Sequence, residues 1–391
     1  MMVEHPRNGR RHHADAAKTS RPPRTKVADL VLSGGGVKGI GLVGAVVALM
    51  EAGYRIGRIS GTSAGSLVGA VMAAAVRGEQ LTGEQLKEIA LSLPYRKFLD
   101  PVSAATVPVL GTAWAALRGR GIYRGDFIHD WVESELRTLG VRTFGDLAID
   151  DPDLPAEQRY RLVVTVADVT RGHLVRLPWD YRRLYGLDPD EQPVADAVRA
   201  SMAIPFFFRP VTLTSAAGST STLIDGGLLS NFPMYSLDRT DGKPPRWPSF
   251  GITVMTQHPA QGDGDPAPGL APLIHLPGAP QLLEAIVNTA LLGHDQTYLT
   301  QPAVTARTIA VDSSGIGYLN FNISHVDREK LYDKGYEAAQ KFLTTWNWPA
   351  YLKRFHRESA ADSLLNHTRQ STKAHLCVSG PGDGNVANRR A

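Results

Sequence analysis

One serine in this chain has neighbours that suit nucleophilic catalysis. Ser63 is the centre of the G-x-S-x-G pattern Gly61–Gly65, which follows an apolar run at 56–60 and precedes another at 66–76. A sharp turn from strand to helix requires flanking residues with little side-chain bulk. Such a turn pushes the serine hydroxyl out of the fold, beside helix amides that favour negative charge. Taken alone, the pattern is equally typical of a small-residue turn that contains a serine.

A glycine loop precedes this pattern. Residues 33–39 read S-G-G-G-V-K-G, between the apolar run 27–32 and a second apolar run, 40–52. Consecutive glycines let backbone N–H groups point into one concavity at a helix N-terminus. A serine nucleophile needs such donors for the oxyanion of its tetrahedral intermediate, which makes Gly34, Gly35 and Gly36 candidates. The loop also matches the dinucleotide pattern G-x-G-x-x-G, but the second strand ends without the acidic residue that binds the ribose.

A third pattern lies much later in the chain. Leu223-Ile224 leads into Asp225-Gly226-Gly227, which indicates a strand that ends in Asp-Gly-Gly. Asp-Gly is a common turn, so this pattern alone favours a structural role.

The three patterns lie between elements that alternate in type. Strand, glycine loop, helix, strand and G-x-S-x-G turn follow one another from residue 27 to residue 76, which predicts a β-α-β-α unit. That order is typical of a mainly parallel sheet covered by helices. Further apolar and amphipathic runs predict strands at 161–167, 223–225, 249–254 and 307–311, and helices at 193–201 and 324–346.

Composition restricts the class of protein. The 391 residues are 43% hydrophobic and 20% charged, which predicts a sizeable core. We expect one α/β domain at 27–357 between disordered tails at 1–26 and 358–391. Of the total net charge of +4, residues 1–26 contribute +5 and the remaining residues about −1. A basic tail on a nearly neutral body does not indicate a nucleic-acid-binding domain. The basic tail could instead contact anionic lipid.

Cysteine usage and hydropathy bear on the cellular compartment of the protein. The single cysteine, Cys377, rules out an intrachain disulfide framework and a cysteine-based metal site. The basic N-terminus lacks the apolar run of a signal peptide, and no run in the chain reaches the length of a spanning helix. These features favour a soluble cytoplasmic protein and leave peripheral membrane contact open. We expect no metal and no cofactor.

In this order, the three motifs resemble the patatin-like phospholipase family. The ordered triplet is far more specific than any one motif, and the similarity extends from about residue 27 to about residue 345. Other segments that resemble the family are 121–126, 143–147, 201–206 and 225–233.

The resemblance implies a three-layer α/β/α sandwich and a Ser–Asp dyad without a catalytic histidine. It implies that Ser63 is the nucleophile and Asp225 the base, and that the N–H groups of Gly35 and Gly36, joined by that of Ala64, bind the oxyanion. It further implies hydrolysis of lipid acyl esters. Residues that support the motifs are Lys38, Gly39, Gly61, Gly65, Gly226 and Gly227. Lys38 departs from the family's frequent arginine, which keeps the charge but loses the bidentate fork.

Read from the residues, this mechanism is chemically consistent. A serine needs a hydrogen-bonded base, and an aspartate becomes an adequate one when partial desolvation raises its pKa. Two alternatives stay open. One is an α/β-hydrolase with a Ser-His-Asp triad, for which the later chain offers His258, His275, His294 and His325. The other is a lipid-binding protein of the same fold without turnover, which the presence of Ser63 and Asp225 disfavours.

Overall fold

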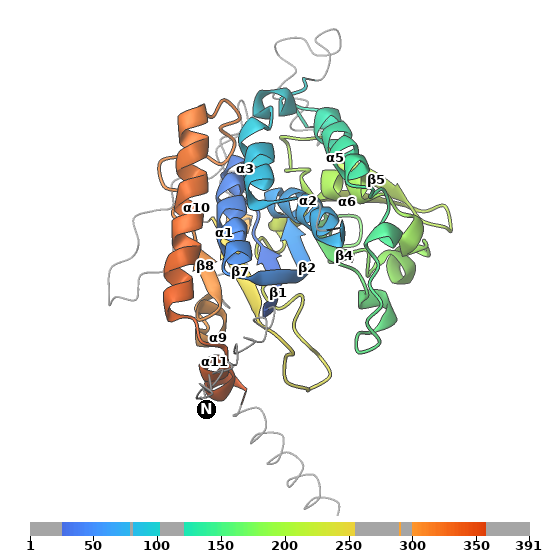
Figure 1. Cartoon of the computed structure of the whole chain (residues 1–391). Helices are drawn as coiled ribbons and strands as arrows, with labels where there is room; N and C mark the ends of the chain where they lie inside the picture. The colour runs from blue at the N-terminus through green and yellow to red at the C-terminus, as the bar shows by residue number, and fades with distance from the viewer. Residues whose placement is uncertain (1–25, 79–80, 102–120, 255–288, 291–298, 357–391) are drawn as a thin grey trace, which may run out of the picture.

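The computed structural model describes residues 26–78, 81–101, 121–254, 289–290 and 299–356 (Figure 1). The described strands are β1 (Lys26–Leu32), β2 (Tyr54–Thr62), β3 (Leu162–Asp168), β4 (His173–Leu177), β5 (Val211–Thr214), β6 (Thr220–Asp225), β7 (Ser249–Thr253) and β8 (Thr308–Ala310). The described helices are α1 (Gly39–Glu51), α2 (Ala64–Gly78), α3 (Gly83–Ser92), α5 (Asp126–Thr138), α6 (Val194–Ser201), α9 (Pro302–Thr305), α10 (His325–Thr345) and α11 (Trp348–Phe355).

The strands form one mixed sheet with helices on both sides, so the predicted α/β fold is confirmed. The order β3-β2-β1-β7-β8 is parallel throughout, whereas β4 and β6 each pair antiparallel with β3, and β5 pairs antiparallel with β6. The sheet is therefore mainly parallel, with an antiparallel part at the β3 end. The predicted strands and the helices 40–52, 66–76 and 193–201 all appear, with ends shifted by at most three residues.

Helix α1 is the centre of the core. Every residue from Gly39 to Leu49 is buried, because the helix lies beneath α3 and α10 as well as against the sheet. The contact with α10 is made backbone to backbone: a Cβ on Gly44 would lie 2.0 Å from the carbonyl oxygen of Tyr332. Because α1 is apolar on every face, and Gly41 and Gly44 let α10 come close, the helix can be covered on all sides. This packing holds the first turn of α1 beside the sheet. In Figure 1, α10, α1 and α3 lie to the left of α2, α5 and α6.

The register of β3 explains how the ends of two strands meet. On one edge of β3, β4 pairs with residues 164–168. On the other edge, β2 pairs with residues 162–165, where Thr62 is opposite Thr165, and β6 takes over at the next position, where Asp225 is opposite Val166. A strand has only two edges, so β2 and β6 share one edge and run toward each other. The residue after Thr62 is Ser63, which is thereby brought beside Asp225.

Some of the sequence predictions fall on residues that are not described. The tails, apart from Lys26 at the start of β1, lie outside the described residues, as do His258, His275 and His294. The limits of the predicted domain at 27–357 therefore stay a prediction.

Candidate active site

Ser63 occupies a strained turn between β2 and α2. Its φ angle is 50°, in the left-handed region that costs a non-glycine residue about 1–3 kcal/mol. Glycine is required on both sides, because a Cβ on Gly61 would lie 2.3 Å from the carbonyl oxygen of Gly65, and one on Gly65 would lie 2.4 Å from that of Leu32. The expectation that the hydroxyl projects out of the fold is wrong: Ser63 is 1% exposed.

The hydroxyl of Ser201 holds this turn against β3. Ser201 Oγ accepts a hydrogen bond from the N–H of Ser63 at 2.9 Å and donates one to the carbonyl oxygen of Thr165 at 2.7 Å. The N–H of Ser63 is therefore engaged in positioning the turn and is not free to bind an oxyanion. In the sequence, this segment is marked only by its resemblance to the family, because no local pattern identifies a serine at the end of α6 as a partner of Ser63.

The glycine loop lies directly beside Ser63. A Cβ on Gly34 would be 3.2 Å from the Cβ of Ser63, and one on Gly39 would be 3.0 Å from the Cβ of Ala64. The N-termini of α1 and α2 are thus adjacent, as the sequence predicted. Gly36 has a φ of 54°, which turns the loop into the short 3-10 helix before α1.

The structure separates the candidate oxyanion donors. The N–H of Gly34 donates to the carbonyl oxygen of Asn231 at 3.0 Å, so the prediction that Gly34 is a free donor is wrong. Within the described part of the chain, no hydrogen bond engages the N–H groups of Gly35, Gly36 and Ala64. These three amides remain as candidates.

Lys38 is buried where its segment meets α1. Lys38 is the last residue of the 3-10 helix Gly36–Lys38, and only 4% of it is exposed. Burial lowers the pKa of its ammonium group, and the charge of Asp312 acts in the opposite direction.

Asp225 is fully buried at the end of β6. Its Oδ1 accepts a hydrogen bond from the N–H of Gly227 at 2.8 Å, so the Asp-Gly-Gly turn orients the carboxylate. Gly226 lies close to β3, since a Cβ there would be 2.4 Å from the carbonyl oxygen of Thr165. Burial raises the pKa of Asp225 to about 7, against smaller lowering effects of Ser63 and Gly227.

The second carboxylate oxygen of Asp225 is available to Ser63. Among the described residues, Oδ2 of Asp225 has no hydrogen bond of good geometry, although the Ser63 side chain is near enough to lower the pKa of the carboxyl group. Catalytic hydrogen bonds are often loose without substrate and tighten when it binds.

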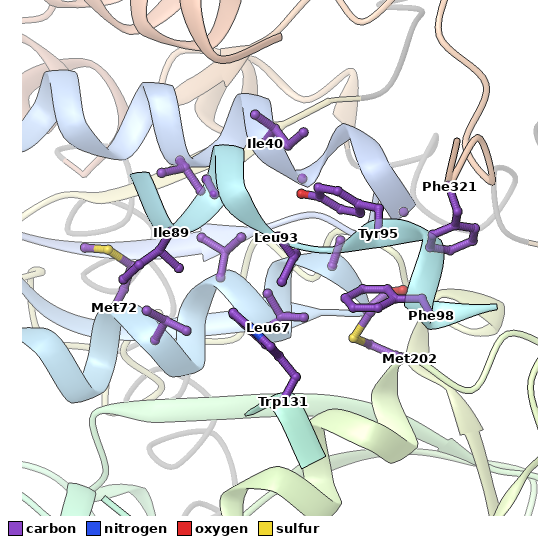
Figure 2. Close-up of a pocket in the computed structure, with 18 of the residues that line it drawn as sticks. Ile40, Leu67, Met72, Ile89, Leu93, Tyr95, Phe98, Trp131, Met202 and Phe321 are labelled. Carbon is purple, nitrogen blue, oxygen red and sulfur yellow. The ribbon is translucent and has the colours of Figure 1, made fainter. Parts of the chain in front are cut away.

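An apolar pocket extends from Ser63 along α2. Figure 2 shows its walls, with Met72 and Ile89 at one side and Tyr95, Phe98 and Phe321 at the other. The α2 side of the pocket is a stripe at helical spacing formed by Ala64, Leu67, Val68, Val71 and Met72. The rest of the lining comes from α1, α3, α5, the two 3-10 helices Gly36–Lys38 and Tyr95–Phe98, and the segments after α6 and before α10; it includes Gly36, Ile40, Leu86, Trp131 and Met202.

Other chemistries find little support among the described side chains. Among the residues that the structure describes, the pocket lining contains no histidine; His325 lies exposed on α10, with its Nδ1 3.6 Å from Glu329 Oε2. In the described residues, no group of three or more His, Cys, Asp or Glu side chains is arranged to hold a metal ion. None of the described helices is long and apolar enough to cross a bilayer.

Comparison with known proteins decides the family. A family model described as patatin-like phospholipase matches residues 30–238, a range that contains the glycine loop, Ser63 and Asp225. The chain belongs to the patatin-like phospholipase family. Membership places this patatin-like chain among lipid acyl hydrolases in general.

The chain is similar to proteins from bacteria and from animals. The uncharacterized protein YqhO of Bacillus subtilis is 32% identical over 321 residues, which cover 82% of this chain and 99% of that protein. Patatin-like phospholipase domain-containing protein 6 of Homo sapiens is 29% identical over 223 residues, or 56% of this patatin-like chain and 13% of that protein. The crystal structure of VipD from Legionella pneumophila has a TM-score of 0.44 and 18% identity, with 81% of this chain and 67% of that chain covered.

Proposed function

We propose that this protein hydrolyses carboxylic esters of lipids, such as the fatty-acyl esters of phospholipids or lysophospholipids, by a Ser63–Asp225 dyad through an acyl-enzyme. One observation carries the proposal. Ser63 lies between a buried carboxylate with a raised pKa and an apolar pocket that could hold an acyl chain. Nucleophile, base and apolar binding site thus converge on one atom, Ser63 Oγ.

In the first half of the reaction, Asp225 accepts the proton of Ser63 and Oγ attacks the ester carbonyl carbon. The resulting oxyanion would accept hydrogen bonds from the N–H groups of Gly35, Gly36 and Ala64, which the fold leaves unused among the described residues. Ala64 is the first residue of α2, so the helix dipole also favours negative charge there. One such donor contributes about 3–4 kcal/mol in a serine protease.

The tetrahedral intermediate then collapses. The bond from the carbonyl carbon to the alcohol oxygen breaks, and Asp225 returns its proton to that oxygen. In the second half, Asp225 takes a proton from water, which attacks the acyl-enzyme. The bond to Ser63 Oγ breaks, the fatty acid leaves, and Oγ regains a proton from Asp225. A base with a pKa of about 7 is suited to both transfers at neutral pH.

The pocket gives the proposal its substrate class. From Ala64 to Met72 the α2 stripe advances by about 12 Å, at about 1.5 Å per residue. An apolar wall of this extent favours a fatty-acyl group over acetyl or another short acyl group.

The test is an acyl-ester panel with matched variants. We expect Ser63→Ala and Asp225→Asn each to lower kcat by about 10³-fold or more, and the double variant to be little worse, because the two residues act as a unit. Replacing His258, His275, His294 and His325 singly by Gln should leave turnover within about tenfold, or about 1.4 kcal/mol. Labelling of Ser63 by a fluorophosphonate probe gives an independent measure of its reactivity.

Two outcomes would defeat this function in different ways. A folded histidine variant as inactive as Ser63→Ala, with Asp225→Asn still active, would move the protein to hydrolases with a catalytic triad. Binding of lipid without turnover and without labelling of Ser63 would make it a lipid-binding protein.

A further inference from the structure

Tyr318 has a buried hydroxyl that the fold does not use. The residue lies between β8 and α10 and is 2% exposed. Among the described residues, its hydroxyl has no hydrogen-bond partner of good geometry. A buried polar group left without a partner costs about 1–3 kcal/mol, and such groups are rare. For stability alone, phenylalanine would be the better residue at this position.

The backbone of Tyr318 supports the glycine loop. Its carbonyl oxygen accepts a hydrogen bond from the N–H of Val37 at 3.1 Å. A Cβ on Gly36 would lie 2.1 Å from that oxygen and 2.9 Å from Cδ1 of the tyrosine ring. This packing explains why an aromatic residue lies against the loop. It does not explain the hydroxyl, since a phenylalanine would make the same contacts.

Tyr318 lies close to the Ser63–Asp225 pair, because its ring packs on Gly36 of the glycine loop and Gly34 of the same loop lies against Ser63. Burial raises the pKa of Tyr318, the negative charge of Asp225 raises it further, and the nearby Ser63 side chain lowers it in part. Among the described residues that line the apolar pocket, Gly36 is present and Tyr318 is not, so the tyrosine lies behind the glycine loop and not in the pocket wall. Two buried oxygen atoms without partners among the described residues, Tyr318 Oη and Asp225 Oδ2, are thereby gathered at one serine.

We propose that Tyr318 is a third catalytic residue, whose phenol O–H donates a hydrogen bond to Ser63 Oγ when that oxygen carries negative charge. The inference rests on the Ser63–Asp225 mechanism proposed above. As Oγ gives its proton to Asp225 and forms its bond to the carbonyl carbon, the phenol stabilises the charge on Oγ. When that bond breaks in deacylation, the electron pair returns to Oγ, which is again stabilised until Asp225 returns the proton. Tyr318 keeps its own proton throughout.

A dyad has a particular need for such a donor. In a triad the base becomes a cation when it accepts the serine proton, and that cation stabilises the charge developing nearby. Asp225 instead changes from an anion to a neutral acid, so no positive charge arises beside Oγ. A neutral O–H fixed in a water-free site supplies part of the missing stabilisation without reorganisation during the reaction.

The decisive variant is Tyr318→Phe in the full chain. We expect kcat to fall by roughly 10–100-fold, less than the 10²–10³-fold loss for an oxyanion-hole donor, with KM within about twofold. The rate of Ser63 labelling by a fluorophosphonate should fall in proportion. The melting temperature should stay the same or rise, because the variant removes an unpaired buried hydroxyl. Tyr181→Phe is the matched control: it removes the hydroxyl of a buried tyrosine whose ring packs on Phe144 and Tyr185, and should leave kcat unchanged.

Each other result overturns the proposal. An active, folded Tyr318→Phe protein with kcat within about twofold shows that the hydroxyl plays no part in the reaction, while the dyad stands. A lower melting temperature assigns the hydroxyl to the fold. A wild-type protein that neither hydrolyses the ester panel nor labels at Ser63 defeats the proposed function, and the role of Tyr318 with it.

Discussion

Ser63 and Asp225 are both shielded from water, and this shielding sets their chemistry. Removal of water disfavours the charged carboxylate and raises the pKa of Asp225 to about 7. The same burial lowers the stability of the folded protein when Asp225 is ionised. In the unfolded chain the carboxyl group is in water and ionises near its ordinary pKa of 3.8. The side chain proposed as the base is thus a source of instability in the folded protein.

This conflict predicts how Asp225→Asn changes stability with pH. The folded protein holds the Asp225 proton more tightly than the unfolded chain, so this residue's contribution to the free energy of unfolding falls as pH rises from about 4 to about 7 and is level above that. Asn cannot ionise, so the variant should be the more stable protein at pH 8, by at most about 4 kcal/mol, and lose most of that advantage at pH 4.

Urea denaturation of both proteins at pH 4 and pH 8 measures the difference. Asp333→Asn, at an exposed position on α10, is the control and should show no such trend. An advantage of Asp225→Asn that is equal at both pH values would mean that Asp225 is not buried as an ionisable group.

At the scale of elements, two strand ends and one helix determine the site. β2 and β6 run toward each other along one edge of β3, which places Ser63 beside Asp225. α2 then leads away from Ser63 and forms one wall of the apolar pocket, while α3 forms another. The length of usable acyl chain should therefore depend on side chains far along α2 and α3 from the nucleophile.

We predict that Ile89→Phe on α3 shifts the preference toward shorter acyl chains. Ile89 lies with Met72 at the side of the pocket opposite Phe321, and a larger ring there would fill space that the end of a long chain needs (Figure 2). For a series of p-nitrophenyl esters, kcat/KM for a twelve-carbon ester should fall by about tenfold, the effect of one or two methylene groups of lost contact. The four-carbon ester should stay within about twofold.

Glu88→Phe adds the same ring to an exposed position on α3 and serves as the control. Equal losses for short and long esters in Ile89→Phe would indicate general damage to the site and would contradict an acyl pocket in this place.

At the scale of the whole molecule, a buried ion pair that affects stability lies in a different part of the sheet from the candidate active site. Asp29 and Arg58 form a buried ion pair between β1 and β2, with Asp29 Oδ2 2.6 Å from Arg58 Nη2. Arg58 lies four residues before the end of β2, about 13 Å from Thr62 at about 3.3 Å per residue. Burial raises the pKa of Asp29, and the charge and hydrogen bonds of Arg58 lower it. The pair is therefore stabilised by its mutual attraction and destabilised by the removal of both charges from water.

Asp29→Asn should therefore lower stability without changing the chemistry. It leaves the charge of Arg58 buried without a counter-charge, which typically costs about 3–5 kcal/mol. We expect a large decrease in the free energy of unfolding and, at a temperature where the variant is folded, an unchanged kcat. Glu133→Gln, which breaks the exposed pair with Arg137 on α5, should change stability by less than about 1 kcal/mol. A comparable loss in kcat and in stability for Asp29→Asn would show that the two parts are coupled.

The sequence by itself determined the local elements and the parts of the site that are continuous in the chain. Gly61 to Gly65 required a tight turn because side chains at its ends would collide with backbone, and hydrophobic runs with glycine between them marked β1, α1, β2 and α2. The order of the three motifs pointed to the family. These features depend on sterics and periodicity within a few residues, which a sequence displays directly.

Only the tertiary structure decided which groups meet at Ser63. The hydrogen bond of Gly34 to Asn231, that of Ser63 to Ser201, and the contact of Gly36 with Tyr318 each join residues more than 130 positions apart. The direction of β6 likewise depends on its pairing with β3, a strand much earlier in the chain. The burial of Ser63 was equally hidden, because α3 and the segments that cover the pocket lie elsewhere in the chain. Contacts of this kind are fixed by strand register and helix packing, and no local pattern of residues encodes them.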